Sequence, residues 1–190
     1  MIRSTAHPSK DDEARWLNGV AQGDLRAFEA LYRTYHPRLT RFLSNMLHRP
    51  ALVEEVLDDT MLVVWSRPEG FGGSSRLSTW IFGIAYRKAL KAARREDEPV
   101  APSGVDERPS LEASPEQAVG QRQSQIVLLQ AIRQLSPEHR AVVDLAYFHE
   151  MAYREIAEVM NCPVDTVKTR MFYARRHLKT KLAGRLVDWL

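Results

Sequence analysis

The chain has 190 residues, of which 44% are hydrophobic and 27% charged, a composition typical of globular proteins and not of disordered or collagen-like chains. Its net charge of +3 conceals three blocks: residues 1–95 hold 15 Lys and Arg against 10 Asp and Glu, residues 96–120 hold 1 against 7, and residues 121–190 hold 11 against 7. No apolar run reaches the roughly 18 residues that a membrane span needs, and the first residues lack the apolar core of a signal peptide. We therefore expect a cytoplasmic protein without membrane insertion, built from two basic lobes and an acidic segment between them.

The first lobe opens with a helical pattern, in which apolar residues recur at steps of three and four. These residues are Leu25, Phe28, Leu31, Tyr32, Tyr35, Leu39, Phe42, Leu43 and Met46. Asp24 is expected to cap the start of the helix. Pro37 removes a backbone donor within the pattern, so we expect a kink there or two helices that meet near His36.

A second helix is expected from Pro50, with one buried face made of Val53, Val56, Leu57, Thr60 and Val64. Its opposite face carries Glu54, Glu55, Asp58, Asp59, Leu62 and Trp65. Large apolar side chains within an acidic rim are typical of a surface that binds a basic protein partner. The alternative is a solvated charged face, with Trp65 packed into the core at the helix end.

The next segment, residues 71–80, is predicted to be a loop, in which Ser78 or a neighbouring serine caps the following helix. Within that helix an aromatic residue and cations fall in one narrow sector: Trp80, Arg87, Lys91 and Arg94. Cations neutralise phosphates and an indole can stack on an unpaired base, so this pattern favours contact with distorted or single-stranded DNA. Alternatively, Trp80 belongs to the core and the cations face solvent.

Residues 96–120 contain four prolines and almost no large apolar side chain. This composition predicts an extended, mobile linker, and hence a variable placement of the two lobes.

The second lobe resumes a helical pattern with Ile126, Leu129, Ile132 and Leu135, and the sequence Ser136-Pro137 is typical of a helix start. That next helix has the apolar set Val142, Val143, Leu145 and Ala146. Residues 153–160 predict a short helix that buries Ile156, Ala157 and Met160. Asn161 is expected in the left-handed turn conformation, before a last helix that begins near Pro163. The lobe is thus predicted to contain a helix-turn-helix motif.

The last helix has an inward face of Val167, Met171, Ala174 and Leu178. Its outward side carries Asp165, Thr169, Phe172, Tyr173 and Arg176, flanked by Thr166, Lys168, Arg170 and Arg175. Seven cations and no acid lie between Asp165 and Asp188. We expect this helix to enter a DNA major groove, the alternative being a merely solvated basic helix. No strand pattern is present, so the predicted fold class is all-α, with two small helical domains joined by a flexible acidic linker.

Several segments together resemble the sigma-70 family of RNA polymerase initiation factors, in its extracytoplasmic-function (ECF) class. AFEALYRTYHPRLTRFL resembles the start of region 2, VEEVLDDTMLVVW its helix for core polymerase, and FGGSSRLSTWIFGIAYRKALKAARR its minus-10 segment. LSPEHRAVVDLAYFHEMAYREIAEVMNCPVDTVKTRMFYARRHL resembles region 4. The resemblance implies region 2 in residues 1–95, a linker in 96–120 and region 4 in 121–190.

The resemblance also implies a role for each group of residues. Core polymerase would be bound, at the clamp of its largest subunit, by Glu54, Glu55, Asp58, Asp59, Leu62 and Trp65, and its flap region is a further expected contact. The minus-10 element would be bound by Ser74, Ser75, Arg76, Trp80, Arg87, Lys91 and Arg94. The minus-35 element would be read by Thr166, Lys168, Thr169, Arg170, Phe172, Tyr173 and Arg176. An anti-sigma factor is the expected inhibitor.

Two other classes of function remain open. The first is a helix-turn-helix regulator that binds duplex DNA by itself, although the stripe that contains Trp80 argues against it. The second is an enzyme, but the sequence has no P-loop or nucleophile elbow, and its six histidines show no metal-ligand spacing. We therefore expect no catalytic residue, metal or cofactor. Cys162 is interpreted as a packing or capping residue, with oxidant sensing as the alternative.

Overall fold

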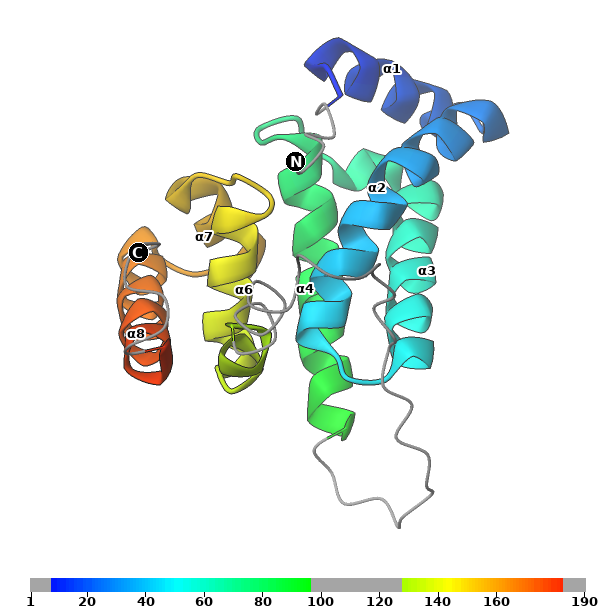
Figure 1. Ribbon diagram of the computed structural model, residues 1–190. Coiled ribbons are helices and arrows are strands. Elements are labelled where there is room, and N and C mark those ends of the chain that lie inside the picture. The colour runs from blue at the N-terminus through cyan, green and yellow to red at the C-terminus, as the bar shows by residue number, and fades with distance from the viewer. Residues whose placement is uncertain (1–7, 97–127, 183–190) are drawn as a thin grey trace, which may run out of the picture.

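The computed structural model describes residues 8–96 and 128–182, and this part of the chain is helical without strands, which confirms the all-α prediction. Helices α1 to α4 form a first lobe, on the right in Figure 1, and α6 to α8 form a second lobe on the left. The elements are α1 (Lys10–Ala21), α2 (Leu25–Met46), α3 (Pro50–Ser66), the short 3-10 helix η1 (Pro68–Gly70), α4 (Leu77–Glu96), α6 (Pro137–Tyr147), α7 (Tyr153–Met160) and α8 (Val164–Leu182). Residues 128–133 are also helical.

The core of the first lobe lies between α2, α3 and α4, which pack on one another. The predicted inner face of α3 is confirmed, since Val53, Val56, Leu57, Thr60 and Val64 are all buried. The predicted cap of α2 is confirmed as well, because a carboxylate oxygen of Asp24 accepts the Arg26 backbone N–H at 2.8 Å. Because this packing determines which sides of α3 and α4 are buried, it also determines which sides face the solvent.

Pro37 does not divide α2, so the expectation of two helices is wrong: one helix runs from Leu25 to Met46. Proline costs this helix one backbone hydrogen bond. The apolar stripe continues past it without interruption, with Tyr35 on one side and Leu39 on the other, both fully buried. Packing along that stripe outweighs the loss of a single bond.

Helix α1 was not expected from the apolar pattern. Its start carries a clear signal, because the Ser9 hydroxyl accepts the Asp12 backbone N–H and three acidic residues follow in the first turn. Val20 is buried, and Trp16 and Leu17 are half-buried against the core. The helix packs across the N-terminal part of α2 (Figure 1).

Helix α4 starts at Leu77, one residue before Ser78, which was expected to cap it. Ser78 lies inside the first turn and is buried, and the Trp80 backbone N–H bonds to the carbonyl of Arg76. The expectation that Ser78 caps the helix is therefore wrong. Its neighbour Ser75 donates its hydroxyl hydrogen to the Arg76 carbonyl.

The second lobe confirms the predicted helix-turn-helix. The Ser136 hydroxyl accepts the His139 backbone N–H at the start of α6, and Asn161 adopts a left-handed conformation between α7 and α8, with φ 48°. The inner face of α8 is buried as predicted, at Val167, Met171, Ala174 and Leu178. Leu129 was expected to join the apolar face of its helix but is 40% exposed, whereas Ala131 and Ile132 are buried.

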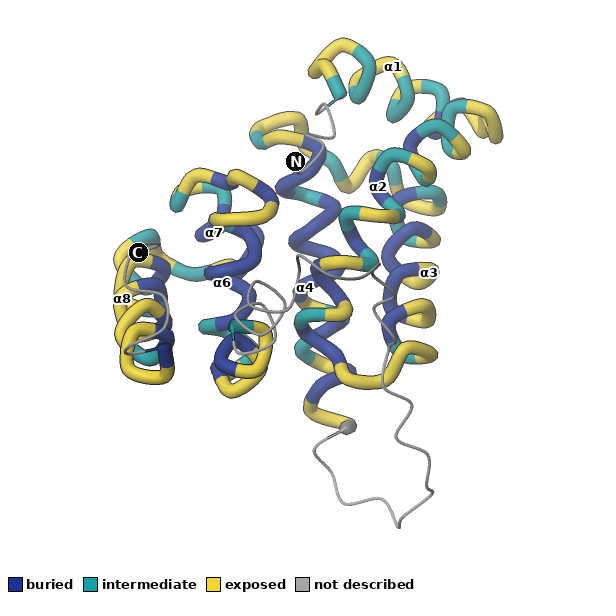
Figure 2. Tube along the Cα trace, viewed as in Figure 1, coloured by how far each residue is buried: buried dark blue, intermediate teal, exposed yellow. Residues whose placement is uncertain are grey.

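The two lobes are in contact, which differs from the expected variable placement. Helix α7 packs on α4, α6 packs on α2, and the buried side chains of both lobes form one continuous core. Figure 2 shows α4 buried along most of its length, between the first-lobe helices and α6 and α7. The predicted linker falls in residues 97–127, outside the described part of the chain, apart from Glu96 at the end of α4.

Within residues 8–96 and 128–182, no helix combines the length and the hydropathy that a membrane crossing requires.

The turn of the helix-turn-helix generates a stability prediction. Replacing Asn161 by Val should destabilise the protein by about 1–2 kcal/mol, because a β-branched residue is strained at positive φ. Asn161→Gly is the matched control and should be nearly neutral, because glycine adopts this conformation freely. Urea unfolding of the three proteins measures the difference, and equal costs for the two substitutions would contradict the account of this turn.

Candidate functional site

The acidic face of α3 lies on the surface, as the sequence indicated. Glu54, Glu55, Asp58 and Asp59 are exposed, and Leu62 retains 60% of its accessible surface. The face combines a large exposed apolar side chain with four carboxylates, an arrangement that suits a partner with both apolar and basic groups.

A groove of about 330 Å³ lies between α2 and this face of α3. Its lining consists of Leu25, Phe28, Tyr32, Asp58, Met61, Leu62 and Trp65. Trp65 is half-buried and packs edge-on against Phe28, with the ring centroids 5.1 Å apart. Trp65 therefore combines the two interpretations given above. One side of its indole packs on α2, as in a core residue, and the residue also lines an open groove, as in a binding surface.

The four carboxylates of α3 differ in their surroundings. Asp59 forms an ion pair with Lys88 of α4 at 2.8 Å, so part of its charge is neutralised within the protein. Asp58 accepts a long hydrogen bond of 3.5 Å from the Tyr32 hydroxyl. Burial raises the pKa of Tyr32, and the negative charges of Asp58 and Glu54 raise it further, so this phenol stays a neutral donor. These differences in ion-pair and hydrogen-bond partners could not be predicted from the sequence, where the four acids look equivalent.

The loop before α4 seats Trp80 at the edge of the first lobe. The indole is half-buried and packs against Phe71, with centroids 5.7 Å apart, and a Cβ at Gly70 would lie 3.4 Å from it. Ser74 is exposed and Ser75 is half-buried. Arg76 extends from this loop to Glu155 of α7, where Nε lies 3.5 Å from a carboxylate oxygen.

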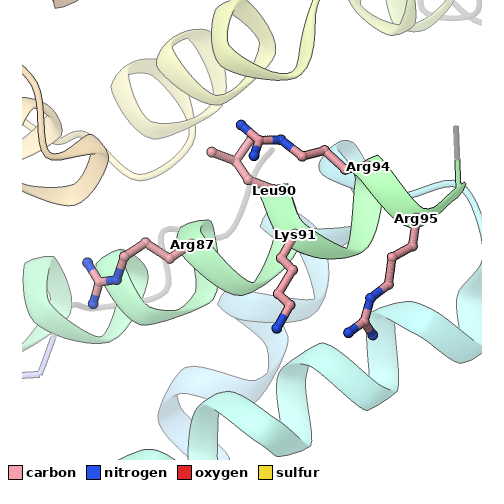
Figure 3. A pocket seen from close by; sticks show the side chains of 5 residues that line it. All are labelled: Arg87, Leu90, Lys91, Arg94 and Arg95. Carbon is pink, nitrogen blue, oxygen red and sulfur yellow. The ribbon is translucent and has the colours of Figure 1, made fainter. Parts of the chain in front are cut away.

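The last turns of α4 carry an exposed cluster of cations around an open pocket of about 510 Å³. Figure 3 shows that its lining comes entirely from α4: Arg87, Leu90, Lys91, Arg94 and Arg95. In that view Lys91 and Arg95 point to one side, and Arg94 points to the other, beside Leu90. The sequence found three of these cations but missed Arg95. No acidic residue lies between Glu69 and Glu96, so a search for a stretch of basic charge without acids would have included Arg95.

The outer face of α8 presents aromatic and basic side chains together. Phe172 is 61% and Tyr173 53% exposed, and their rings meet edge to face, with centroids 5.5 Å apart. Thr169 and Arg176 are exposed beside them. Two exposed aromatic rings in a cationic setting have the chemistry to contact base edges and to neutralise phosphates.

Other residues expected on that face are partly engaged elsewhere. Lys168 forms an exposed ion pair with Asp165 at 2.9 Å, and the Thr169 hydroxyl donates to the Asp165 carbonyl. Arg170 is half-buried, and its guanidinium lies 3.7 Å from Cys162 Sγ. Thr166 is half-buried too. The structure therefore brings Lys168, Thr169, Phe172, Tyr173 and Arg176 to one surface, with Thr166 and Arg170 on its inner side.

A groove of about 650 Å³ between α6 and α8 extends this surface, and the sequence did not indicate it. Its lining includes His139, Tyr173, Arg176, His177 and Lys181. The sequence alone does not reveal this groove, because His139 on one side lies 34 to 42 positions before the residues named on the other side, and only the packing of α6 on α8 brings them together. Among the residues described, no group of three or more His, Cys, Asp or Glu side chains is arranged to hold a metal ion.

Comparison with known proteins finds the same family in both lobes. The model of sigma-70 region 2 matches residues 31–98, and the model of sigma-70 region 4 matches residues 125–178. The RNA polymerase sigma-H factor of Pseudomonas aeruginosa is 26% identical over 184 residues, which cover 92% of this chain and 95% of that protein. The ECF RNA polymerase sigma factor SigL of Mycobacterium tuberculosis is 28% identical over 167 residues, which cover 87% and 94%.

Solved structures show the same fold. CnrH, in complex with the cytosolic domain of CnrY, superposes with a TM-score of 0.67 at 20% identity and covers 92% of this chain and 97% of that one. The sigma factor RpoE of Bartonella quintana, in complex with the anti-sigma factor NepR, gives a TM-score of 0.63 at 22% identity, over 85% of this chain and 99% of that one.

The groove between α6 and α8 generates a prediction about pH. Burial is the largest effect on the pKa of His139 and lowers it; the charge of Glu138 raises the pKa, the charges of Arg170 and His177 lower it, and the net shift is downward. The unfolded chain, in which the pKa is about 6.5, then binds the proton more readily than the folded chain. The stability that neutral His139 contributes is present above about pH 6.5 and is lost as the pH falls toward the lowered pKa.

Wild type should therefore lose more stability than His139→Gln between pH 7.5 and pH 5.5 in urea unfolding. The glutamine keeps a hydrogen-bonding side chain that does not titrate. Equal losses for the two proteins would mean that His139 is not the group responsible.

Proposed function

The chain belongs to the sigma-70 family of RNA polymerase sigma factors, in the extracytoplasmic-function (ECF) class, and on this basis we propose a separate binding partner for each of its three exposed faces. The α3 face binds core polymerase, the loop and cations of α4 bind the minus-10 element, and the outer face of α8 reads the minus-35 element. Residues 1–95 act as region 2, residues 96–120 as the linker and residues 121–190 as region 4.

The groove between α2 and α3 is the observation that carries the polymerase contact. A protein that only binds duplex DNA has no use for an exposed leucine beside four carboxylates, because phosphates are repelled there. Leu62 and Trp65 supply apolar area, and Glu54, Glu55 and Asp58 supply charge for basic residues at the clamp of the largest subunit. Asp59 contributes less, because Lys88 already pairs with it.

The minus-10 contact rests on the combination of Trp80 with the α4 cations. The indole presents a partly exposed ring beside the loop that holds Ser74, Ser75 and Arg76, where an unpaired base can stack. Arg87, Lys91 and Arg94 then neutralise phosphates of the opened strand, and we add Arg95 to this set. Stacking on an unpaired base gains free energy only after the duplex opens, so binding energy favours melting without covalent chemistry or a catalytic residue.

The minus-35 contact rests on the exposed face of α8. Lys168, Thr169 and Arg176 can reach phosphates or base edges, and Phe172 can pack on a thymine methyl group. Tyr173 lines the groove with His139, which widens the contact surface toward the start of α6. Asp165 lowers the net charge at the start of the helix and pairs with Lys168.

The remaining partners follow from the family. Solved relatives of similar fold carry the cytosolic domain of CnrY or the anti-sigma factor NepR, and we infer that an anti-sigma factor restrains this chain as well. The flap region of the polymerase is a second expected contact, made by region 4. The protein is expected to act in the cytoplasm, where RNA polymerase works. An autonomous helix-turn-helix regulator is the alternative function, supported by α8 alone.

The proposed polymerase contact predicts that Leu62→Ser weakens binding to core RNA polymerase. Burying a leucine side chain gains about 1.5–3 kcal/mol, so the dissociation constant should rise roughly 10- to 100-fold. Leu129→Ser is the matched control, because Leu129 is an exposed leucine of the second lobe. Titration of labelled protein with core polymerase measures both affinities. Equal affinities of the two variants would place the polymerase contact elsewhere.

The proposed minus-35 contact predicts that Arg176→Ala weakens the binding of holoenzyme to promoter DNA selected from a random library. Each lost phosphate contact should also reduce the slope of log affinity against log salt concentration by about one. Arg133→Ala is the control, because Arg133 is exposed outside α8. A loss of affinity with an unchanged salt slope would argue against a phosphate contact at Arg176.

A further inference from the structure

The groove between α6 and α8 extends beyond the residues that we assign to the minus-35 element. Tyr173 and Arg176 belong to both sets, and the groove adds further polar side chains to them. The added side chains include Ser136, His139, His177, Thr180 and Lys181. Among the described residues that line the groove, none is acidic. Cations and hydrogen-bond donors around a hollow of about 650 Å³ suit an anionic group.

His139 lies on the α6 side of this groove, next to the cap of its own helix. Its Nδ1 is 2.7 Å from the Ser136 hydroxyl oxygen, and its ring meets that of Tyr173 edge to face, with the centroids 6.5 Å apart. The Ser136 hydroxyl can donate to Nδ1 when the imidazole is neutral and accept from it when the imidazole is protonated. His139 therefore keeps this partner in both charge states, and its Nε2 carries a hydrogen in both.

The surroundings of His139 oppose its protonation as long as no anion is present. Burial lowers the pKa of His139 most; the charge of Glu138 beside it raises the pKa, and the charges of Arg170 and His177 on α8 lower it. Two more cations line the groove on the α8 side, Arg176 and Lys181. A phosphate bound among these groups would reverse the balance, because a nearby negative charge favours the protonated imidazole.

The place of the groove along α8 puts it beside the DNA backbone in the proposed minus-35 complex. A recognition helix contacts base edges with its N-terminal residues, here Lys168 and Thr169. At 1.5 Å per residue, Arg176 and Lys181 lie roughly 12 Å and 20 Å beyond Lys168 along the helix axis, whereas the major groove is about 12 Å wide. These later residues are therefore expected where the helix leaves the major groove, next to the phosphates of the flanking strand.

We propose that the groove between α6 and α8 holds a phosphate group of the duplex beside the minus-35 element, and that His139 takes up a proton when this phosphate binds. The inference rests on the function proposed for α8 and adds a residue of α6 to it. Arg176 and Lys181 neutralise the phosphate, and protonated His139 donates to it from Nε2. Because protonation and binding are linked, the affinity for duplex rises as the pH falls through the pKa of His139 in the complex, and this gain is lost above that pKa.

The linkage is tested by the affinity of holoenzyme for promoter duplex selected from a random library, measured at two pH values and one salt concentration. Between about pH 8 and about pH 6, wild type should gain roughly three- to tenfold more affinity than His139→Gln, because a rise of one pKa unit on binding corresponds to a factor of ten. His48→Gln is the matched control, since His48 is exposed in the turn between α2 and α3, and it should keep the pH dependence of wild type. Equal pH dependence of wild type and His139→Gln would overturn the proposal.

The proton itself is followed by NMR of the full chain, labelled at its histidine rings and without polymerase. A duplex of unselected sequence at low salt should raise the pKa of His139 by about one unit or more, because every duplex supplies phosphates. The spectrum of His139→Gln identifies the resonance, and Lys181→Gln, which leaves His139 in place, should show a smaller rise. No rise in wild type would overturn the proposal. An equal rise with inorganic phosphate at the same phosphate concentration would overturn the assignment to the DNA backbone.

The two experiments separate this inference from the function on which it rests. If Arg176→Ala weakens duplex binding but His139→Gln leaves its pH dependence unchanged, α8 contacts DNA and the inference alone fails. If holoenzyme does not bind the selected duplex, the function proposed for α8 fails, and the NMR measurement still decides whether the groove takes up a phosphate of the duplex. Circular dichroism of each variant confirms that it is folded.

Discussion

The buried guanidinium of Arg140 is the interaction on which the arrangement of the two lobes depends. It donates to the carbonyls of Arg133 at 2.9 Å and Leu135 at 3.0 Å, where the preceding helix ends, and to the carbonyl of Asn45 in the first lobe. Burial lowers its pKa. These carbonyls, two of them at the end of a helix, replace water around both terminal nitrogens of the buried charge, whereas Nε has no hydrogen-bond partner in the described part of the chain. One side chain thus joins the start of α6 and the helix before it to Asn45 of the first lobe, 95 residues away in the sequence.

Two surfaces of opposite charge can coexist on a chain this small because the bundle separates them. The inner faces of α2, α3 and α4 share one core, and the outer surfaces are lined by different elements: α2 and α3 line the acidic groove, and α4 alone lines the cationic pocket. Lys88 and Asp59 meet where the two surfaces adjoin, and their ion pair reduces the charge of both there. We infer that the separation lets one lobe bind a basic protein surface and opened DNA together.

The sequence predicted most of the helices and both exposed faces, because a 3.6-residue period fixes which side chains point inward. It predicted the turn at Asn161 and the buried stripes of α3 and α8 correctly. It failed where packing overrides local rules, as at Pro37, and where a helix has few apolar residues, as in α1. It could not find the contact between the lobes, because Asn45 and Arg140 carry no pattern that relates them. The role of Arg76 in that contact was hidden for the same reason.

The central claim is that this chain gives RNA polymerase its promoter specificity, and run-off transcription tests it most directly. Purified core polymerase is given a promoter library with and without the protein, and the transcripts are sequenced. New transcripts that share two upstream elements and depend on the protein are the predicted result. No new transcript, together with tight binding of duplex DNA by the protein alone, would contradict the claim and favour an autonomous DNA-binding regulator.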